Sequence, residues 1–175
     1  MKRLFTLLAL TLTGVPALAG SNSHEAHLNL IRTAEEVVEV RVNPVDCWEM
    51  DNTYGYYWGA KKLLVICQQN ARRANVHTLW TEEDYDTLRH EVHHLIQDCS
   101  VGEAGDLQTG VFFDNREDYN NFVSGAIPPN TVNNIRSAYS DKEARDIEME
   151  VEAFAVASAI SAETLAGVVT KVCTK

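Results

Sequence analysis

Two histidines four residues apart, His90 and His94, enclose a glutamate, Glu91, in the run His-Glu-Val-His-His. On an α-helix such histidines lie one turn apart on the same face, so both imidazoles can reach a single Zn²⁺ ion. Glu91 then lies where its carboxylate can take a proton from a zinc-bound water. The spacing therefore predicts two zinc ligands and a general base. His93 points away from the face that His90 and His94 share, so we expect it to be solvated.

The residues before and within this run predict the helix that the chemistry requires. Thr81 is followed by three acidic residues, which is typical of a helix start: a side-chain oxygen caps free N–H groups, and carboxylates favour the positive end of the helix dipole. Apolar residues then recur at helical spacing: Tyr85, Leu88, Val92, Leu95 and Ile96. We expect an amphipathic helix over residues 81–98. One further stripe of it carries His90, His94 and Gln97.

A catalytic zinc site needs a third protein ligand while one position stays open to water. Residues 99–105 contain no histidine, which excludes the third histidine of the metzincin pattern. A later predicted helix, rich in alanine, offers three carboxylates: Glu148, Glu150 and Glu152. Small residues allow two helices to approach closely enough for a short carboxylate to reach a metal on the other helix. The residues alone do not decide which of the three glutamates is the third ligand. The alternative is that none of them binds metal and that they form an exposed acidic face of the helix.

These two segments resemble the gluzincin metallopeptidases, which pair H-E-x-x-H with a downstream E-x-x-A or E-x-E-A helix. Glu150-Val151-Glu152-Ala153 fits both spellings, and the run from His90 to Gln97 also looks like secreted or toxin-associated members with H-E-x-x-H-x-x-Q. The resemblance covers residues 81–98 and 146–159. It implies a zinc peptidase in which Glu150 is the third ligand.

Many gluzincins carry an Asp or Asn four residues after the ligand glutamate, where it bonds a ligand histidine. Here that position is Phe154, which departs from the family pattern. A competing register uses Glu148 as the ligand and Glu152 as the carboxylate that orients a histidine. Tyr139 or Tyr119 is a candidate hydrogen-bond donor to the oxyanion of a tetrahedral intermediate. We expect no function for the other histidines at positions 24, 27 and 77, the first two lying in a flexible N-terminus.

The first nineteen residues predict a secretory signal peptide. Two basic residues precede an apolar run over residues 4–12, and small residues at positions 17–19 suit cleavage before Gly20. The run is short for a membrane span, and no later segment is long and apolar enough to cross a bilayer. We expect an exported protein, periplasmic or extracellular, with one zincin-like domain over residues 20–175.

The acidic charge restricts the class of partner. The formal net charge is −10, and loss of Lys2 and Arg3 with the signal peptide would make it −12. An acidic surface without a basic stripe excludes a nucleic-acid partner. We expect a peptide or protein substrate, with mild preference for a cationic one.

Four cysteines are widely spaced along the chain: Cys47, Cys67, Cys99 and Cys173. This spacing fits disulfides better than a cysteine-rich zinc site, which would need C-x-x-C pairs. Three connectivities are possible. We favour Cys47–Cys67 between neighbouring strands and Cys99–Cys173 between the end of the motif helix and the C-terminus; free buried thiols are the alternative.

The overall pattern predicts a helix-rich α+β fold with a small sheet beside the motif helix. Strands are expected at residues 37–42 and 61–67. Helices are expected, besides the motif helix, over residues 24–36, 114–124, 131–139, 141–160 and 161–173. The order of strand, connection and motif helix is that of a zincin, in which an edge strand borders the cleft above the metal. The rival functions are a non-catalytic exported module stabilised by metal and a disulfide-stapled binding domain.

Overall fold

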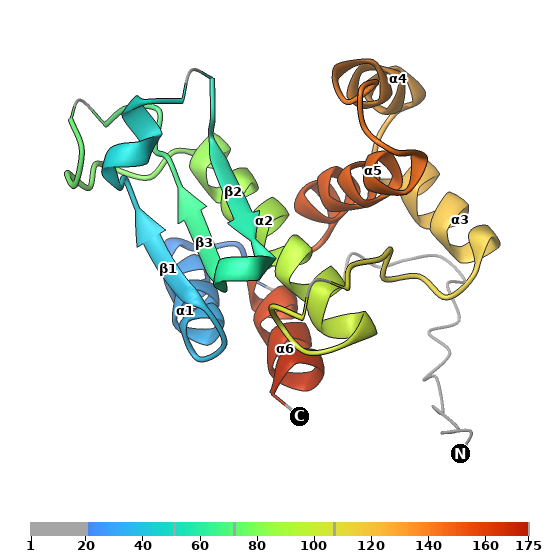
Figure 1. The fold of residues 1–175 in the computed structure, drawn as a ribbon, viewed down its shortest axis with the longest axis horizontal. Coiled ribbons are helices and arrows are strands. Elements are labelled where there is room, and N and C mark those ends of the chain that lie inside the picture. The colour runs from blue at the N-terminus through green and yellow to red at the C-terminus, as the bar shows by residue number, and fades with distance from the viewer. Residues whose placement is uncertain (1–20, 51, 72, 107, 175) are drawn as a thin grey trace.

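Six α-helices and a three-stranded mixed sheet make up the part of the chain that the computed structural model describes (Figure 1). The described residues are 21–50, 52–71, 73–106 and 108–174. The signal-peptide prediction falls outside them. The arrangement confirms the predicted α+β class. Within the described residues, no helix has the length and apolar character needed to span a membrane.

The sheet is built around β3 (Leu63–Ile66), whose four residues are all buried. β1 (Glu39–Val42) pairs with it in parallel and β2 (Gly55–Trp58) pairs antiparallel, giving the order β1-β3-β2. The predictions at residues 37–42 and 61–67 match β1 and β3. β2 was not predicted, because its aromatic residues are bounded by glycines and show no alternation of apolar and polar types.

α2 (Glu82–Val101) is the motif helix, and it lies between the sheet and the helices that follow it in the chain (Figure 1). A capping box begins it: the Thr81 hydroxyl accepts from the Asp84 N–H at 3.2 Å, and the Asp84 carboxylate accepts from the Thr81 N–H at 2.8 Å. The predicted start is confirmed. α2 continues three residues past the expected end, to Val101, before Gly102.

α1 (His24–Glu35) and α6 (Ala162–Cys173) pack against each other, and α6 also packs along α2. With β3 they enclose the main apolar core, whose fully buried side chains include Leu30, Leu64, Leu88, Leu95 and Val169. The expectation of a flexible N-terminus at His24 and His27 is wrong, since both lie in α1 and His27 is 1% exposed. Ser23 caps this helix, so its start is set locally.

α5 (Ala144–Ala159) packs along α2 on the side away from the sheet (Figure 1). Its fully buried Ala153 presents no bulk, which allows the close approach inferred from the sequence. The Arg89 guanidinium of α2 donates to the Ala157 carbonyl near the end of α5 at 2.9 Å and ties the two helices together.

α3 (Arg116–Ala126) and α4 (Pro129–Ala138) pack on α5 and form a second apolar cluster with it. The buried residues of this cluster are Tyr119, Val123, Ile127, Ile135, Val151 and Ala155. α5 begins three residues later than predicted. The cluster supports α5 from the side opposite α2, so the helix is fixed on two faces.

Two disulfides, Cys47–Cys67 and Cys99–Cys173, confirm the favoured connectivity. We expected Cys47 to lie in a strand, but it lies in the 3₁₀ turn Val45–Trp48 that follows β1. Cys99–Cys173 joins the last turns of α2 and α6. Both bonds are compatible with an oxidising, extracellular environment.

Candidate metal centre

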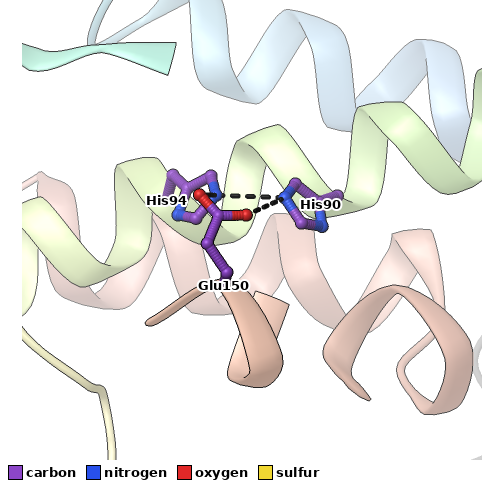
Figure 2. A group of neighbouring side chains, drawn as sticks. All are labelled: His90, His94 and Glu150. Atoms are coloured by element: carbon purple, nitrogen blue, oxygen red, sulfur yellow. Dashed lines mark hydrogen bonds and ion pairs between the residues drawn. The ribbon is translucent and has the colours of Figure 1, made fainter. Parts of the chain in front are cut away.

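His90 and His94 project from one face of α2, and the Glu150 carboxylate reaches them from α5 (Figure 2). The two Nε2 atoms lie 3.1 Å apart. Glu150 Oε2 lies 3.3 Å from Nε2 of His90, and Glu150 Oε1 lies 3.6 Å from Nε2 of His94. Ligand atoms from these three side chains all lie within 4.8 Å of one another, so the group could hold a metal ion.

The three candidate glutamates of α5 have different surroundings. Glu150 contacts both histidines, whereas Glu148 forms an ion pair with Arg116 at 2.8 Å. The Glu152 carboxylate is fully buried and accepts a hydrogen bond from the Gln97 side chain at 2.7 Å. Of these three, Glu150 therefore joins the histidine pair, and the register with Glu148 as the ligand does not fit.

The three donor groups differ in protonation. Burial lowers the pKa of His90 to about 4, despite the nearby Glu150 carboxylate. At His94 burial also opposes the charged form, but contact with Glu150 and the charge of Glu91 outweigh it and raise the pKa to about 9. Burial acts to raise the pKa of Glu150, but its contacts with both histidines bring it well below its usual range. Glu150 is therefore ionised at neutral pH, as a cation ligand must be.

Glu91 lies beside this group and is only 7% exposed. Burial raises the pKa of Glu91 to about 7; the His94 charge opposes the shift and the Glu150 charge adds to it. The carboxyl group can therefore both accept and release a proton near neutral pH. β2 approaches α2 closely here, because a Cβ atom on Gly55 would lie 3.1 Å from Glu91 Cγ.

His93 is buried, at 3% exposure, so the expectation that it is solvated is wrong. His93 is not part of the group that could hold a metal ion, and its ring lies against α5 and not in water. His93 Nε2 lies 3.6 Å from Glu152 Oε2, and the ring of Phe112 lies beside it. His77 is exposed, as expected.

A cleft of about 310 Å³ opens beside the group, and His94 and Glu150 form part of its wall. The other lining residues come from the β2 end of the sheet, from α2 and the loop after it, and from the α4–α5 region: Tyr57, Gly59, Gln97, Thr109, Tyr139, Lys142, Asp146 and Met149. Of the two candidate tyrosines, Tyr139 lines the cleft. Tyr119 instead packs in the second apolar cluster and donates to the Glu148 carbonyl at 3.1 Å.

Two parts of this site were missed from the sequence. Tyr57 borders the cleft from β2, a strand that the local pattern did not reveal. Gln97 was placed on the histidine stripe, but its contacts were not predicted: its side-chain oxygen lies 2.8 Å from His94 Nδ1. The spacing of three residues between His94 and Gln97 is the one local signal that could have indicated this pair.

Comparison with protein families places nearly the whole chain in one family. Residues 18–174 match the model of a family described as a domain of unknown function, DUF8637. The chain belongs to the DUF8637 family. The match includes all four site residues of this DUF8637 domain: His90, Glu91, His94 and Glu150. No curated protein and no solved structure matches the chain.

Proposed function

We propose that this protein is an exported zinc-dependent peptidase. The observation that carries the proposal is the convergence of His90, His94 and Glu150 beside the buried carboxyl group of Glu91. Two imidazoles and one carboxylate form the donor set of the His₂Glu class of catalytic zinc sites. The resemblance to gluzincins points to the same set.

The donor spacing supports zinc as the metal. Ligand atoms about 2.0–2.1 Å from a tetrahedral zinc lie roughly 3.3 Å from one another. The two histidine Nε2 atoms lie 3.1 Å apart, close to this spacing, and each of them has one Glu150 oxygen nearby: Oε2 lies 3.3 Å from His90 and Oε1 lies 3.6 Å from His94. His94 and Glu150 also line the cleft, so a fourth position on that side is accessible to water.

Zinc, when bound, supplies Lewis-acid polarisation of a carbonyl group and lowers the pKa of a water molecule toward about 7. Glu91, buried beside the residues that would hold the ion, would accept the proton of the attacking water and pass it to the leaving amine. Tyr139, on the cleft wall, is the candidate donor to the developing oxyanion.

The substrate class that we propose is a peptide or an extended protein segment. β2 is an edge strand of the sheet, and Tyr57 of this strand lines the cleft. An extended peptide can add to such an edge through main-chain hydrogen bonds. The acidic chain favours cationic substrates and disfavours nucleic acid. Export through the predicted signal peptide, to the periplasm or beyond, agrees with the two disulfides.

Zinc stoichiometry tests the metal centre directly. Elemental analysis of the protein from residue 20 onward should give about one zinc per chain for the wild type and much less for Glu150→Gln. Glu148→Gln is the matched control, because Glu148 lies on the same helix but pairs with Arg116. One zinc in both glutamate variants would overturn Glu150 as the ligand.

No zinc in a folded wild type, even after zinc is added, would instead favour a disulfide-stapled binding module. Stoichiometric zinc without hydrolysis of any member of a broad peptide mixture would favour a metal-stabilised module. Hydrolysis that disappears on chelation and returns with zinc is the result that we expect.

A further inference from the structure

Glu152 is a fully buried carboxylate outside the metal-binding group, and nothing in the proposed reaction uses it. Burying a carboxylate is costly unless hydrogen bonds satisfy it. Here Oε2 accepts from Gln97 Nε2 at 2.7 Å, and the two oxygens lie 2.9 and 3.0 Å from the backbone nitrogen of Phe112. The carboxylate is therefore held by donors from α2 and from the loop that precedes α3.

The contacts of Gln97 determine which way its side-chain amide faces. The Gln97 amide nitrogen lies 2.7 Å from Glu152 Oε2 and 3.1 Å from the Met149 carbonyl oxygen. A carbonyl oxygen only accepts hydrogen bonds, and both Glu152 oxygens already accept from the Phe112 N–H, so an amide oxygen in this place would face two acceptors. The two amide hydrogens are thus both used, and the amide oxygen must face the other way.

The amide oxygen of Gln97 faces His94, 2.8 Å from Nδ1. Because this oxygen only accepts, Nδ1 must be the nitrogen that carries a hydrogen. Nε2 of His94 then points toward His90 and Glu150, as a ligand atom would. Metal-binding histidines commonly donate their second N–H to such an acceptor, which fixes both the tautomer and the ring orientation.

We propose that Glu152 is a positioning residue that acts through Gln97 to hold His94 with Nε2 toward the metal. The proposal rests on the metal centre of the proposed function. It gives a role to a glutamate that is not part of the donor group but contacts Gln97, which lines the cleft. We call this chain of contacts the relay: Glu152 of α5 holds Gln97 of α2, Gln97 holds His94, and His94 faces Glu150 of α5.

The competing role for Glu152 is purely structural, as an anchor for the Phe112 loop or as a partner of His93. The His93 contact is the weaker one, since its 3.6 Å separation exceeds hydrogen-bond length, whereas the Gln97 contact is 2.7 Å. A structural role would change stability without changing the hydrogen bond at His94 Nδ1. The test therefore needs to observe that hydrogen bond itself.

Three variants separate these roles. Glu152→Leu removes the acceptor, and Gln97→Met removes the relay with little change in volume. Glu152→Gln keeps a carbonyl oxygen that can accept from both Gln97 and Phe112. The matched control is Glu148→Gln, on the same helix but outside the relay. Each is examined by zinc competition with a chelator and by NMR of the His94 Nδ1–H proton, which is present whether the imidazole is neutral or charged.

The wild type should show a His94 Nδ1–H proton that exchanges slowly with water, with or without zinc. Gln97→Met and Glu152→Leu should lose this protection and bind zinc about 10–100-fold more weakly. Glu152→Gln and Glu148→Gln should stay within about threefold of wild type. The double variant that combines Gln97→Met with Glu152→Leu should lose no more zinc affinity than Gln97→Met alone, because the two residues act in series.

Full protection and unchanged zinc affinity in folded Glu152→Leu would overturn the proposal, as would additive losses in the double variant. If Glu152→Leu does not fold, the wild-type protein still tests the proposal. Rapid exchange with water of the Gln97 amide protons or of the His94 Nδ1–H proton would refute the relay. A wild type with the protected proton but without zinc binding would contradict the proposed function and leave the relay standing.

Discussion

The ring of Phe154 packs edge-on against the imidazole of His90, with ring centroids 4.5 Å apart and planes at 68°. Among the described residues, the buried Nδ1 atom of His90 has no hydrogen-bond partner. His94 differs, because its Nδ1 meets the Gln97 side-chain oxygen. The two proposed ligands of α2 are therefore held by different forces: a hydrogen bond orients His94, and aromatic packing orients His90.

We expect Phe154→Ala to weaken zinc binding, because it leaves the His90 ring free to turn and opens Nδ1 to water. A loss of up to about tenfold is expected, at the lower end of the range for losing a ligand's supporting contact. Phe154→Leu is the control that keeps apolar bulk, and it should stay within about twofold. Chelator competition measures both, and equal affinity of wild type and Phe154→Ala would contradict the packing role.

Glu91→Gln should retain zinc and lose turnover. The amide keeps the size of the side chain but cannot accept the proton of the attacking water, and general-base catalysis contributes about 10²–10⁴-fold. Glu83→Gln, an exposed position in the first turn of α2, is the matched control. Zinc content and the rate of peptide hydrolysis are measured together; hydrolysis at the wild-type rate would refute the mechanism.

Gly55→Ala should disturb the packing of β2 on α2. The added Cβ would lie 2.7 Å from Thr87 Cγ2 and 2.8 Å from the Val65 carbonyl oxygen, so the strand must shift. We expect a loss of about 1–3 kcal/mol in the free energy of unfolding and a lower kcat, since Glu91 lies against the same glycine.

Gly167→Ala in α6 provides the contrast to this substitution. A Cβ there meets nothing within 4 Å, so the change should stabilise the protein by about 0.5–1 kcal/mol through helix propensity. Urea unfolding measures both variants. Equal stability of Gly55→Ala and wild type would show that β2 tolerates the shift.

Acid should destabilise the protein through His27. Its Nδ1 lies 2.9 Å from the Ser23 carbonyl oxygen and its Nε2 lies 2.7 Å from an Arg89 nitrogen, so the neutral ring donates at one end and accepts at the other. Burial lowers the pKa of His27, and the Arg89 charge adds to this against the hydrogen bond to Ser23. Protonation would place an N–H group against the guanidinium.

The sign of the pH effect follows from this lowered pKa. The unfolded chain regains the ordinary pKa of about 6.5 and binds a proton that the folded state resists. The His27 contribution is therefore complete above pH 6.5 and falls as the pH decreases, by at most about 1.4 kcal/mol per pH unit. His27→Gln should reduce this slope between pH 7.5 and 5, whereas the exposed His77→Gln should not; parallel slopes for all three proteins would contradict the assignment.

The sequence determined the elements whose signals are local. Capping at Thr81, the helical recurrence of apolar residues and the H-E-x-x-H spacing predicted α2 and the face shared by His90 and His94, because neighbours on a helix are set by backbone geometry alone. The continuous apolar run at residues 63–66 likewise predicted the strand β3. The disulfide partners were favoured correctly but could not be derived, since pairing depends on which elements meet.

Tertiary structure decided which of three equivalent glutamates faces the histidines. Glu148, Glu150 and Glu152 are alike in local sequence, and the rotation of α5 against α2 alone turns Glu150 toward the pair and buries Glu152 against Gln97. The same packing buries His93, which we expected to be solvated. A carboxylate's role is set by the groups within hydrogen-bond or ion-pair distance of it, and for these three residues those groups come from segments more than thirty positions away in the chain.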